Sequence, residues 1–298
     1  SLEKSEIVVG AVRKHEDHSP LSVRNLDEHF PLRSEDIEKE NSLKLESPWT
    51  PDQLKFVHAD APVRIVVGLP GSGKTTVLQK AVEARKGQRV LYITWSRELT
   101  RQAEERFKSF APQDVEVETL DFATFLNEVT GETLARLPLR ESRRLFNESI
   151  SALSSECLGA WATRKQALFA EIRAVLLGRA TFHERCQPEG GVLRLSEKRY
   201  LDQRGKEKGV GLRHAKSLLS VFKAIEKSEL KKIFPELEAA TQATRLLREN
   251  DLTGSLLDFD RIVLDEAQDL TLLESEVIVE LCRAIAKPRD HAPWLLIA

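Results

Sequence analysis

The stretch GLPGSGKTT, residues 68–76, decides the fold class expected for this chain. It fits the pattern G-x-x-x-x-G-K-[ST], whose fixed positions are filled by Gly68, Gly73, Lys74 and Thr75. A mostly apolar run at 63–67 precedes it and apolar residues at helical spacing follow it, so the pattern predicts a strand, a tight loop and a helix. Glycines let the N–H groups of the loop point inward, and the helix directs its positive end to the same point. The stretch therefore predicts a phosphate-binding site.

The chemistry of this loop predicts ATP and Mg²⁺ as its ligands. Lys74 would reach the β- and γ-phosphates, and the hydroxyl of Thr75 would ligate the metal ion. The expected nucleotide-binding residues are those of the whole loop: Gly68, Leu69, Pro70, Gly71, Ser72, Gly73, Lys74, Thr75 and Thr76. The alternative is an ordinary glycine-rich turn that binds no ligand.

Composition excludes several classes of protein. The 298 residues are 41% hydrophobic and carry a formal net charge of −2, which suits a globular chain and places any basic surface locally. No apolar stretch approaches the roughly 18 residues that span a membrane, so no membrane partner is expected. The first residues show no signal-peptide pattern. The cysteines, Cys157, Cys186 and Cys282, lie too far apart for a metal knuckle, which favours a reducing, cytoplasmic compartment.

Periodicity divides the chain into three parts. Residues 1–47 are an N-terminal extension with a short strand possible at Ile7–Val9, and residues 129–257 are amphipathic runs that predict a helical insertion. Residues 48–128 and 258–298 alternate strand and helix patterns, which predicts a parallel sheet. The predicted fold class is α/β: a P-loop NTPase sheet with a mostly α-helical inserted subdomain. Expected strands are 63–67, 89–95 and 115–119; expected helices are 51–58, 74–85, 97–109 and 121–128.

A second motif, RIVLDEAQDL at 261–270, supplies a partner for the phosphate loop. Its apolar residues predict a buried strand with Asp265 and Glu266 at the carboxyl end, where ligands bind in open α/β sheets. Asp265 would hold Mg²⁺, and Glu266 would activate the attacking water as general base. Gln268 would sense the γ-phosphate, so Glu266, Lys74 and Gln268 form the expected catalytic group. The alternative is an acidic turn that caps the helix beginning near Thr271.

The two motifs together resemble those of superfamily 1 helicases of the UvrD/Rep type. The stretch PWTPDQLKFV, residues 48–57, looks like the Q motif of that family, in which Gln53 would read the adenine. The resemblance covers roughly residues 48–298. It implies a RecA-like ATPase domain, and the insertion, which contains RYLDQRGKEKGVGLRHAKSLLSVFKAIE, looks like the accessory domain of bacterial members.

Two further stretches resemble nucleic-acid motifs of the same family. YITWSRELTRQAEERF at 92–107 resembles motif Ia, and VETLDFATFL at 117–126 is similar to motif Ib, although Asp121 stands where the family usually has His. The resemblance implies that these residues touch single-stranded DNA: Thr94, Trp95 and Ser96 from motif Ia, and Thr119 from motif Ib. For Trp95 the alternative is a core tryptophan at a strand end.

The run at 194–216 holds eight Lys or Arg and three Asp or Glu, with glycines between them. It predicts a basic loop that contacts phosphates, which gives affinity without sequence information. The residues expected to make these contacts are Arg199, Arg204 and Lys206. On charge alone, a solvated loop between helices is an equal alternative.

These features favour the N-terminal ATP-binding half of an ATP-dependent DNA helicase or translocase. The expected partners are single-stranded DNA and duplex/single-strand junctions. In the family a second RecA-like domain with arginine fingers follows, so we expect very weak ATP hydrolysis from these 298 residues alone. The alternative is an ATP-gated nucleic-acid- or protein-binding module without helicase activity. An unrelated P-loop enzyme such as a kinase would not account for DEAQD or the Q motif.

Overall fold

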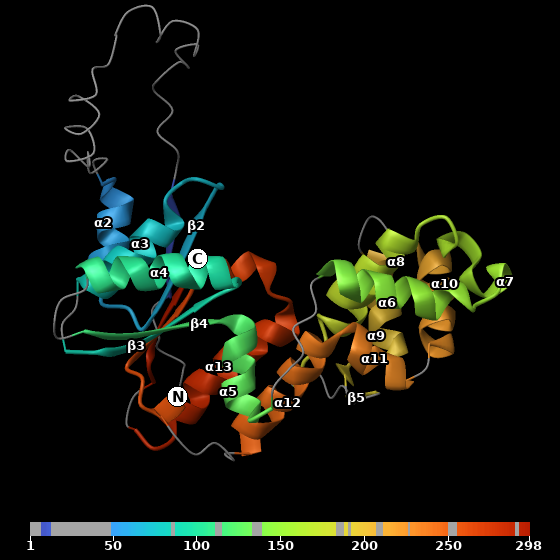
Figure 1. The fold of residues 1–298 in the computed structure, drawn as a ribbon. Helices are drawn as coiled ribbons and strands as arrows, with labels where there is room; N and C mark the ends of the chain where they lie inside the picture. Colours follow the sequence, from blue (N-terminus) through green and yellow to red (C-terminus); the bar gives the residue numbers. More distant parts are fainter. Residues whose placement is uncertain are drawn as a thin grey trace, which may run out of the picture.

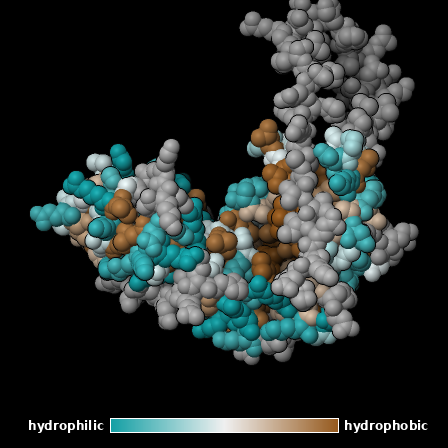
Figure 2. Space-filling model, turned by 180° about the vertical axis from the view of Figure 1, so that it is seen from behind, coloured by the Kyte–Doolittle hydropathy of each residue, from teal (hydrophilic) through white to brown (hydrophobic). Residues whose placement is uncertain are grey.

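The computed structural model contains an α/β lobe and a helical lobe (Figure 1). It describes residues 7–12, 49–84, 87–110, 115–132, 139–182, 188–189, 192–206, 211–225, 227–249, 255–289 and 292–298. Seen from behind, both lobes present a largely hydrophilic surface with scattered apolar patches, and a hollow lies between them (Figure 2). No described helix is both long enough and apolar enough to cross a bilayer.

The α/β lobe is built on a six-stranded parallel sheet, which confirms the predicted fold class. The strands are β1 (Ile7–Val12), β2 (Val63–Gly68), β3 (Arg89–Thr94), β4 (Glu116–Asp121), β7 (Arg261–Leu264) and β8 (Trp294–Ile297), in the order β1-β2-β8-β7-β3-β4. Only β8 separates β2, which leads into the phosphate loop, from β7, which leads into the acidic motif. Because the strands are parallel, both motifs emerge at the same edge of the sheet.

Helices cover both faces of this sheet. The helices of the α/β lobe are α2 (Pro51–His58), α3 (Lys74–Glu83), α4 (Arg97–Phe110), α5 (Phe122–Thr130), α12 (Pro235–Glu249) and α13 (Leu272–Ala286). Alternate residues of β3 enter different cores: Tyr92 packs with α2, α3 and α4, whereas Ile93 packs with α5, α12 and α13. The expected strands and helices between 51 and 130 are all present, with ends that differ by at most a few residues.

The N-terminal segment takes part in the sheet. Strand β1 pairs in parallel with β2, from Ile7 opposite Val63 to Val12 opposite Gly68. The strand expected at Ile7–Val9 is therefore confirmed and is longer than expected. Six residues of the predicted extension belong to the parallel sheet, and the rest of that extension up to residue 48 lies outside the described residues.

The helical lobe comes from the predicted insertion. Its helices are α6 (Leu139–Ser151), α7 (Ser155–Leu158), α8 (Lys165–Glu171), α9 (Glu197–Lys206), α10 (Leu212–Ala224) and α11 (Lys227–Ile233). A π-helical segment, Ile172–Leu177, continues α8, and two short strands, β5 (Pro188–Glu189) and β6 (Val192–Leu193), form an antiparallel ribbon. Helix α12, also within the predicted insertion, packs instead against α5 and α13 and so joins the lobes (Figure 1).

Two buried arginines tie helices to the sheet at the end opposite the phosphate loop. Arg64 donates to the carbonyl oxygen of Phe56 in the last turn of α2, at 2.5 Å, and Arg261 donates to that of Ala81 in α3, at 2.8 Å. Their guanidinium groups lie over the ring of Trp294, 5.6 and 5.4 Å from its centroid. Positive charge at the carboxyl end of a helix and over an aromatic face is stabilising in both respects. These contacts hold α3, and with it the phosphate loop, in a fixed position on the sheet.

Candidate nucleotide-binding site

The phosphate loop leaves β2 at Gly68 and enters α3 at Lys74. Gly71 and Gly73 have φ angles of 76° and 83°, a left-handed conformation that favours glycine. No side chain caps α3, so the N–H groups of its first turn are available at the loop. The hydroxyl oxygen of Ser72 is buried and has no hydrogen-bond partner in the described part of the chain. A loop with spare donors at a helix N-terminus fits a bound phosphate.

Lys74 and Thr75 both point back toward the sheet edge. The ammonium group of Lys74 donates to the carbonyl oxygen of Gly68 at 3.3 Å, across the mouth of the loop. The hydroxyl of Thr75 donates to Oδ1 of Asp265 at 3.2 Å, although the two residues are 190 positions apart. The fold therefore brings the two predicted motifs into direct contact.

Asp265 is the centre of this contact. Its carboxylate is buried and accepts hydrogen bonds from Thr75, from the phenol of Tyr92 at 2.8 Å and from the backbone N–H of Glu266 at 3.0 Å. Burial raises the pKa of Asp265 above its ordinary value, and the hydrogen bonds from Tyr92 and Thr75 oppose that rise. A hydroxyl and a carboxylate oxygen 3.2 Å apart are the hard ligands that Mg²⁺ prefers, so these residues fit the predicted metal.

Glu266 has an unusual backbone. At φ 59° it is the one non-glycine residue with positive φ in the part of the chain that the structure describes. Such a conformation costs of order 1–3 kcal/mol and is commonly found at functional sites. The amide of Gln268 donates to the carboxylate of Glu266, and Ala267 donates its N–H to the carbonyl oxygen of Ala298 at 2.6 Å. The strained turn follows Asp265 directly in the chain, and the Glu266 side chain is half-buried there.

The acidic motif does not cap the helix that follows it. Helix α13 is capped by Thr271, whose hydroxyl accepts from the N–H of Glu274 at 3.3 Å while the Glu274 carboxylate accepts from the N–H of Thr271 at 2.7 Å. The cap is complete without Asp265 or Glu266. The alternative interpretation of these two acids as capping residues is therefore wrong.

Gln53 lies beside the phosphate loop. Its side-chain oxygen accepts from the N–H of Thr50 at 2.9 Å in a capping box at the start of α2. Its amide nitrogen lies 3.7 Å from the position that a Cβ on Gly73 would occupy. Gln53 is thus held next to the loop by its own helix cap, with its amide N–H groups facing the loop. Its predicted contact with adenine stays a prediction.

The helical lobe meets the start of α13, directly after the acidic motif, around Gly178. A Cβ placed on Gly178 would lie 2.6 Å from the carbonyl oxygen of Arg173 and 2.7 Å from Cγ2 of Thr271. The carbonyl oxygen of Gly178 accepts from the N–H of Leu273 at 2.9 Å, and Arg173 lies 3.7 Å from Glu274. A cavity of about 560 Å³ borders this junction, lined by residues of both lobes. The π-helical segment is thereby fixed to the start of α13, a contact that sequence reasoning missed.

The residues predicted to touch single-stranded DNA have different environments. Thr94 is 1% exposed, and its hydroxyl bonds the carbonyl oxygen of Ser96 and the hydroxyl of Thr100, both at 3.0 Å, so its side chain faces inward. Trp95 is half-buried and stacks on Phe122 with 6.1 Å between ring centroids. Ser96 uses its hydroxyl to cap α4, and Thr119 is half-buried on β4. The inward position of Thr94 corrects its expected direct contact with DNA.

The basic run at 194–216 does not form one basic loop. The guanidinium group of Arg204 is buried in an ion pair with Glu171, which also accepts from the phenol of Tyr200 at 2.9 Å. The expectation that Arg204 contacts DNA is corrected by this pair, because an internal carboxylate occupies its donors. Arg199 is exposed, and the side chain of Lys206 lies outside what the structure describes.

Comparison with known proteins agrees with this geometry. Residues 64–125, from β2 to the first turn of α5, match the viral superfamily 1 RNA helicase core domain. The match supports a superfamily 1 helicase core. It covers the phosphate loop, Tyr92 and the Thr94–Ser96 segment. It supports a helicase-like nucleotide-binding function and suggests NTP hydrolysis, without specifying a DNA or an RNA helicase. A search of curated proteins gave no match.

Proposed function

We propose that this chain forms the ATP-binding core of a superfamily 1 helicase or translocase of the UvrD/Rep type, which couples ATP hydrolysis to movement along single-stranded DNA. The observation that carries the proposal is the 3.2 Å contact between Thr75 and Asp265, because it joins a phosphate loop to a carboxylate at the same sheet edge. The similarity of residues 64–125 to a superfamily 1 core supports it. Duplex/single-strand junctions are the proposed partners of the complete protein.

Each residue of the site has a chemical role in this proposal. Lys74 exchanges its contact with the carbonyl oxygen of Gly68 for the β- and γ-phosphates of ATP. Thr75 and Asp265 would hold Mg²⁺, which would neutralise charge on the phosphate oxygens. Glu266 accepts a proton from the attacking water, and Gln268 orients that carboxylate through its amide.

The nucleic-acid path follows the loop after β3. Trp95, Ser96 and Thr119 are the proposed contacts from the α/β lobe, and Arg199 is the proposed contact from α9. RNA is the alternative substrate, favoured by the similarity of residues 64–125 to a viral RNA helicase core. Turnover measured with oligo-dT and with oligo-rU of equal length distinguishes the two.

Calorimetric titration with ATP and Mg²⁺ tests the nucleotide site. Lys74→Ala is expected to weaken ATP binding at least tenfold, because it removes a charge that contacts two phosphates. Lys80→Ala is the matched control, since Lys80 lies on the same helix, is 44% exposed and pairs with Glu83 at 3.4 Å. Equal titrations for wild type and Lys74→Ala would refute the assignment of the loop.

Hydrolysis tests the enzymatic part of the proposal. Glu266→Gln keeps the size of the side chain but removes the base, so ATP should still bind while the very weak oligonucleotide-stimulated phosphate release expected of these residues is lost. An ATP-binding module without helicase activity would show the same phosphate release for wild type and Glu266→Gln. That result would favour the non-enzymatic alternative.

A further inference from the structure

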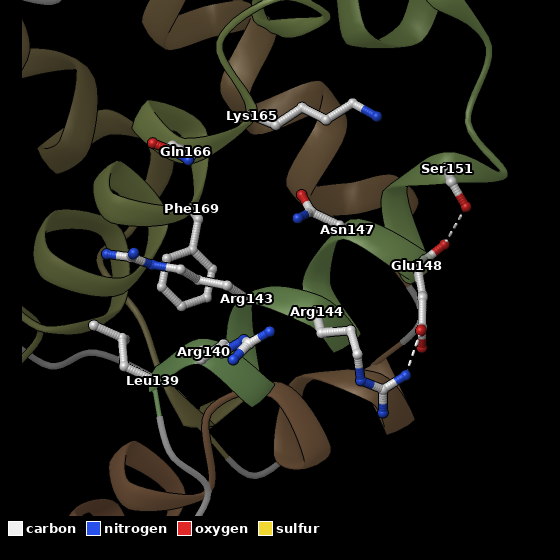
Figure 3. A pocket seen from close by; sticks show the side chains of 10 residues that line it. All are labelled: Leu139, Arg140, Arg143, Arg144, Asn147, Glu148, Ser151, Lys165, Gln166 and Phe169. Atoms are coloured by element: carbon white, nitrogen blue, oxygen red, sulfur yellow. Dashed lines mark hydrogen bonds and ion pairs between the residues drawn. The ribbon is translucent and has the colours of Figure 1, made fainter.

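A groove on the helical lobe lies between α6 and α8 and has a volume of about 640 Å³ (Figure 3). Its floor is Phe169 of α8, which is 2% exposed and meets Phe146 of α6 edge to face with 5.3 Å between ring centroids. Leu139, 47% exposed, forms an apolar rim at the start of α6. We refer to this cavity as the α6–α8 groove. None of its residues belongs to the nucleotide site.

The α6–α8 groove is lined by more Arg and Lys side chains than carboxylates. Arg140, Arg143 and Lys165 line it, and none of them lies within 4.0 Å of a carboxylate among the described residues. The first turn of α8, where Lys165 lies, contains no acidic residue. By contrast, Arg144 on the same wall is engaged by Glu141 and Glu148. Arg144 is thus already paired with carboxylates, whereas the other three cations are available for an external anion.

The shape of the groove indicates which anion fits. Arg143 is held over the ring of Phe169, 5.9 Å from the centroid, and an anchored guanidinium plane can stack on a base while it binds a phosphate. The amides of Asn147 and Gln166 face the same space from the two helices (Figure 3). Amides bond the edges of bases, and the apolar rim contacts an unstacked base. From Arg140 to Ser151 the helix wall spans about 16 Å, which accommodates several phosphates.

We propose that the α6–α8 groove binds a segment of single-stranded nucleic acid, with Arg140, Arg143 and Lys165 on the phosphodiesters and the groove wall against the bases. The inference rests on the proposed helicase function for the choice of a polynucleotide. A duplex presents a convex backbone with its bases stacked inside, which uses the cations but leaves the apolar rim and the amides without partners. An acidic peptide without aromatic residues uses the cations and the rim but offers no aromatic ring to stack on Arg143.

Fluorescence anisotropy with labelled dT20 and rU20 and no nucleotide present tests the groove. The triple variant Arg140→Ala/Arg143→Ala/Lys165→Ala of the full chain should weaken single-strand binding at least tenfold at low salt. The slope of log K against log[salt] should become shallower by about two units, at about 0.7 unit per phosphate contact. The two oligonucleotides distinguish DNA from RNA. Lys165→Glu is a second, single-site variant, expected to weaken binding in the same direction.

The matched control removes three exposed cations that already have carboxylate partners. Lys108, Lys223 and Lys232 each pair with a nearby glutamate on other surfaces, so their joint replacement by alanine keeps the same net charge as the groove variant. The proposal is overturned if the control weakens binding as much as the groove variant does. It is also overturned if the groove variant binds dT20 and rU20 like wild type. Duplex DNA and a polyglutamate peptide are titrated in parallel, and a variant that loses binding to only one of these two ligands also overturns the proposal.

The groove and the nucleotide site are judged by separate results. The anisotropy titration contains no ATP, so it reports on oligonucleotide binding without occupancy of the nucleotide site. Loss of binding in the groove variant together with unchanged ATP titration of Lys74→Ala would support the groove and refute the nucleotide assignment. The reverse pair of results would refute the groove alone.

Discussion

The phenol of Tyr92 donates a 2.8 Å hydrogen bond to Oδ2 of Asp265, the carboxylate whose other oxygen accepts from Thr75. Tyr92 is fully buried on β3, which lies beside β7 in the sheet. The carboxylate is therefore oriented from the sheet side before any ligand binds. A ligand held in advance needs less rearrangement when a metal ion binds, so Tyr92 acts on the site by positioning Asp265.

Tyr92→Phe is expected to weaken Mg²⁺-dependent ATP binding by roughly tenfold, a change of about 1.4 kcal/mol, and to lower the free energy of unfolding by about 1–3 kcal/mol. Both effects arise because a buried carboxylate oxygen loses its donor. Calorimetry at several Mg²⁺ concentrations and thermal unfolding measure them. Tyr200→Phe is the matched control, because the Tyr200 phenol donates to the buried carboxylate of Glu171 at 2.9 Å in the other lobe. A loss of ATP affinity in both variants would contradict a specific role for Tyr92.

Gly178→Ala is expected to destabilise the fold by about 1–3 kcal/mol, because the new methyl group would lie 2.6 Å from the carbonyl oxygen of Arg173 and 2.7 Å from Cγ2 of Thr271. Adding Thr271→Ser removes that Cγ2 and keeps the capping hydroxyl, so the double variant should recover part of the loss. A double-mutant cycle by chemical denaturation measures the coupling. Gly211→Ala is the control, since a Cβ there meets nothing within 4 Å. Additive effects of the two substitutions would contradict the contact.

Gln53→Ala is expected to reduce the preference for ATP over GTP by roughly tenfold, or about 1.4 kcal/mol, if Gln53 reads adenine. The same substitution disturbs the cap of α2, so it needs a control for stability. Thr50→Ala breaks that capping box from the other side and should cost about 1 kcal/mol of stability while leaving the preference for ATP unchanged. Competition binding with the two nucleotides measures the preference. An unchanged ratio in Gln53→Ala would show that Gln53 serves the helix cap alone.

Arg204→Met is expected to lower the free energy of unfolding by about 3–5 kcal/mol, because it leaves the buried Glu171 carboxylate without its cation. The salt slope of oligonucleotide binding should stay unchanged, since Arg204 does not face solvent. Denaturant unfolding and anisotropy measure the two quantities. Arg144→Met removes an exposed arginine with two glutamate partners and should change stability little. A shallower salt slope for a folded Arg204→Met would restore the nucleic-acid role expected from the sequence.

The residues that the sequence predicted well are those whose chemistry is local. The phosphate loop needs glycines at positive φ next to Lys74, and the acidic motif needs a carboxylate at the end of a buried strand. Each of these requirements is met within a single stretch of at most ten residues. Asp121 also has a local role, which was not predicted from the sequence: its carboxylate accepts from the N–H of Thr124 at 3.3 Å and caps α5. An acidic residue at that position is explained by the hydrogen bond that it accepts as the N-cap of α5.

The residues that the sequence could not predict depend on distant partners. Nothing in the run 194–216 shows that Glu171, 33 positions away, neutralises Arg204. In the same way, Tyr92 reads as an ordinary strand residue until β3 and β7 are paired. The cations of the α6–α8 groove are divided between two helices, so no continuous basic run in the sequence indicates them. Charge counted along the chain does not show which cations are paired in space and which remain available to a ligand.

The parallel pairing of β1 with β2 also covers the outer hydrogen-bonding groups of β2. Without residues 7–12, β2 would form the border of the sheet, and its row of N–H and C=O groups from Val63 to Gly68 would be open to a strand of another molecule. That strand leads directly into the phosphate loop, so intermolecular pairing there would both promote aggregation and obstruct nucleotide entry. Residues 7–12 therefore place the open edge of the sheet on β1, one strand further from the phosphate loop, and removing them would place that edge on β2.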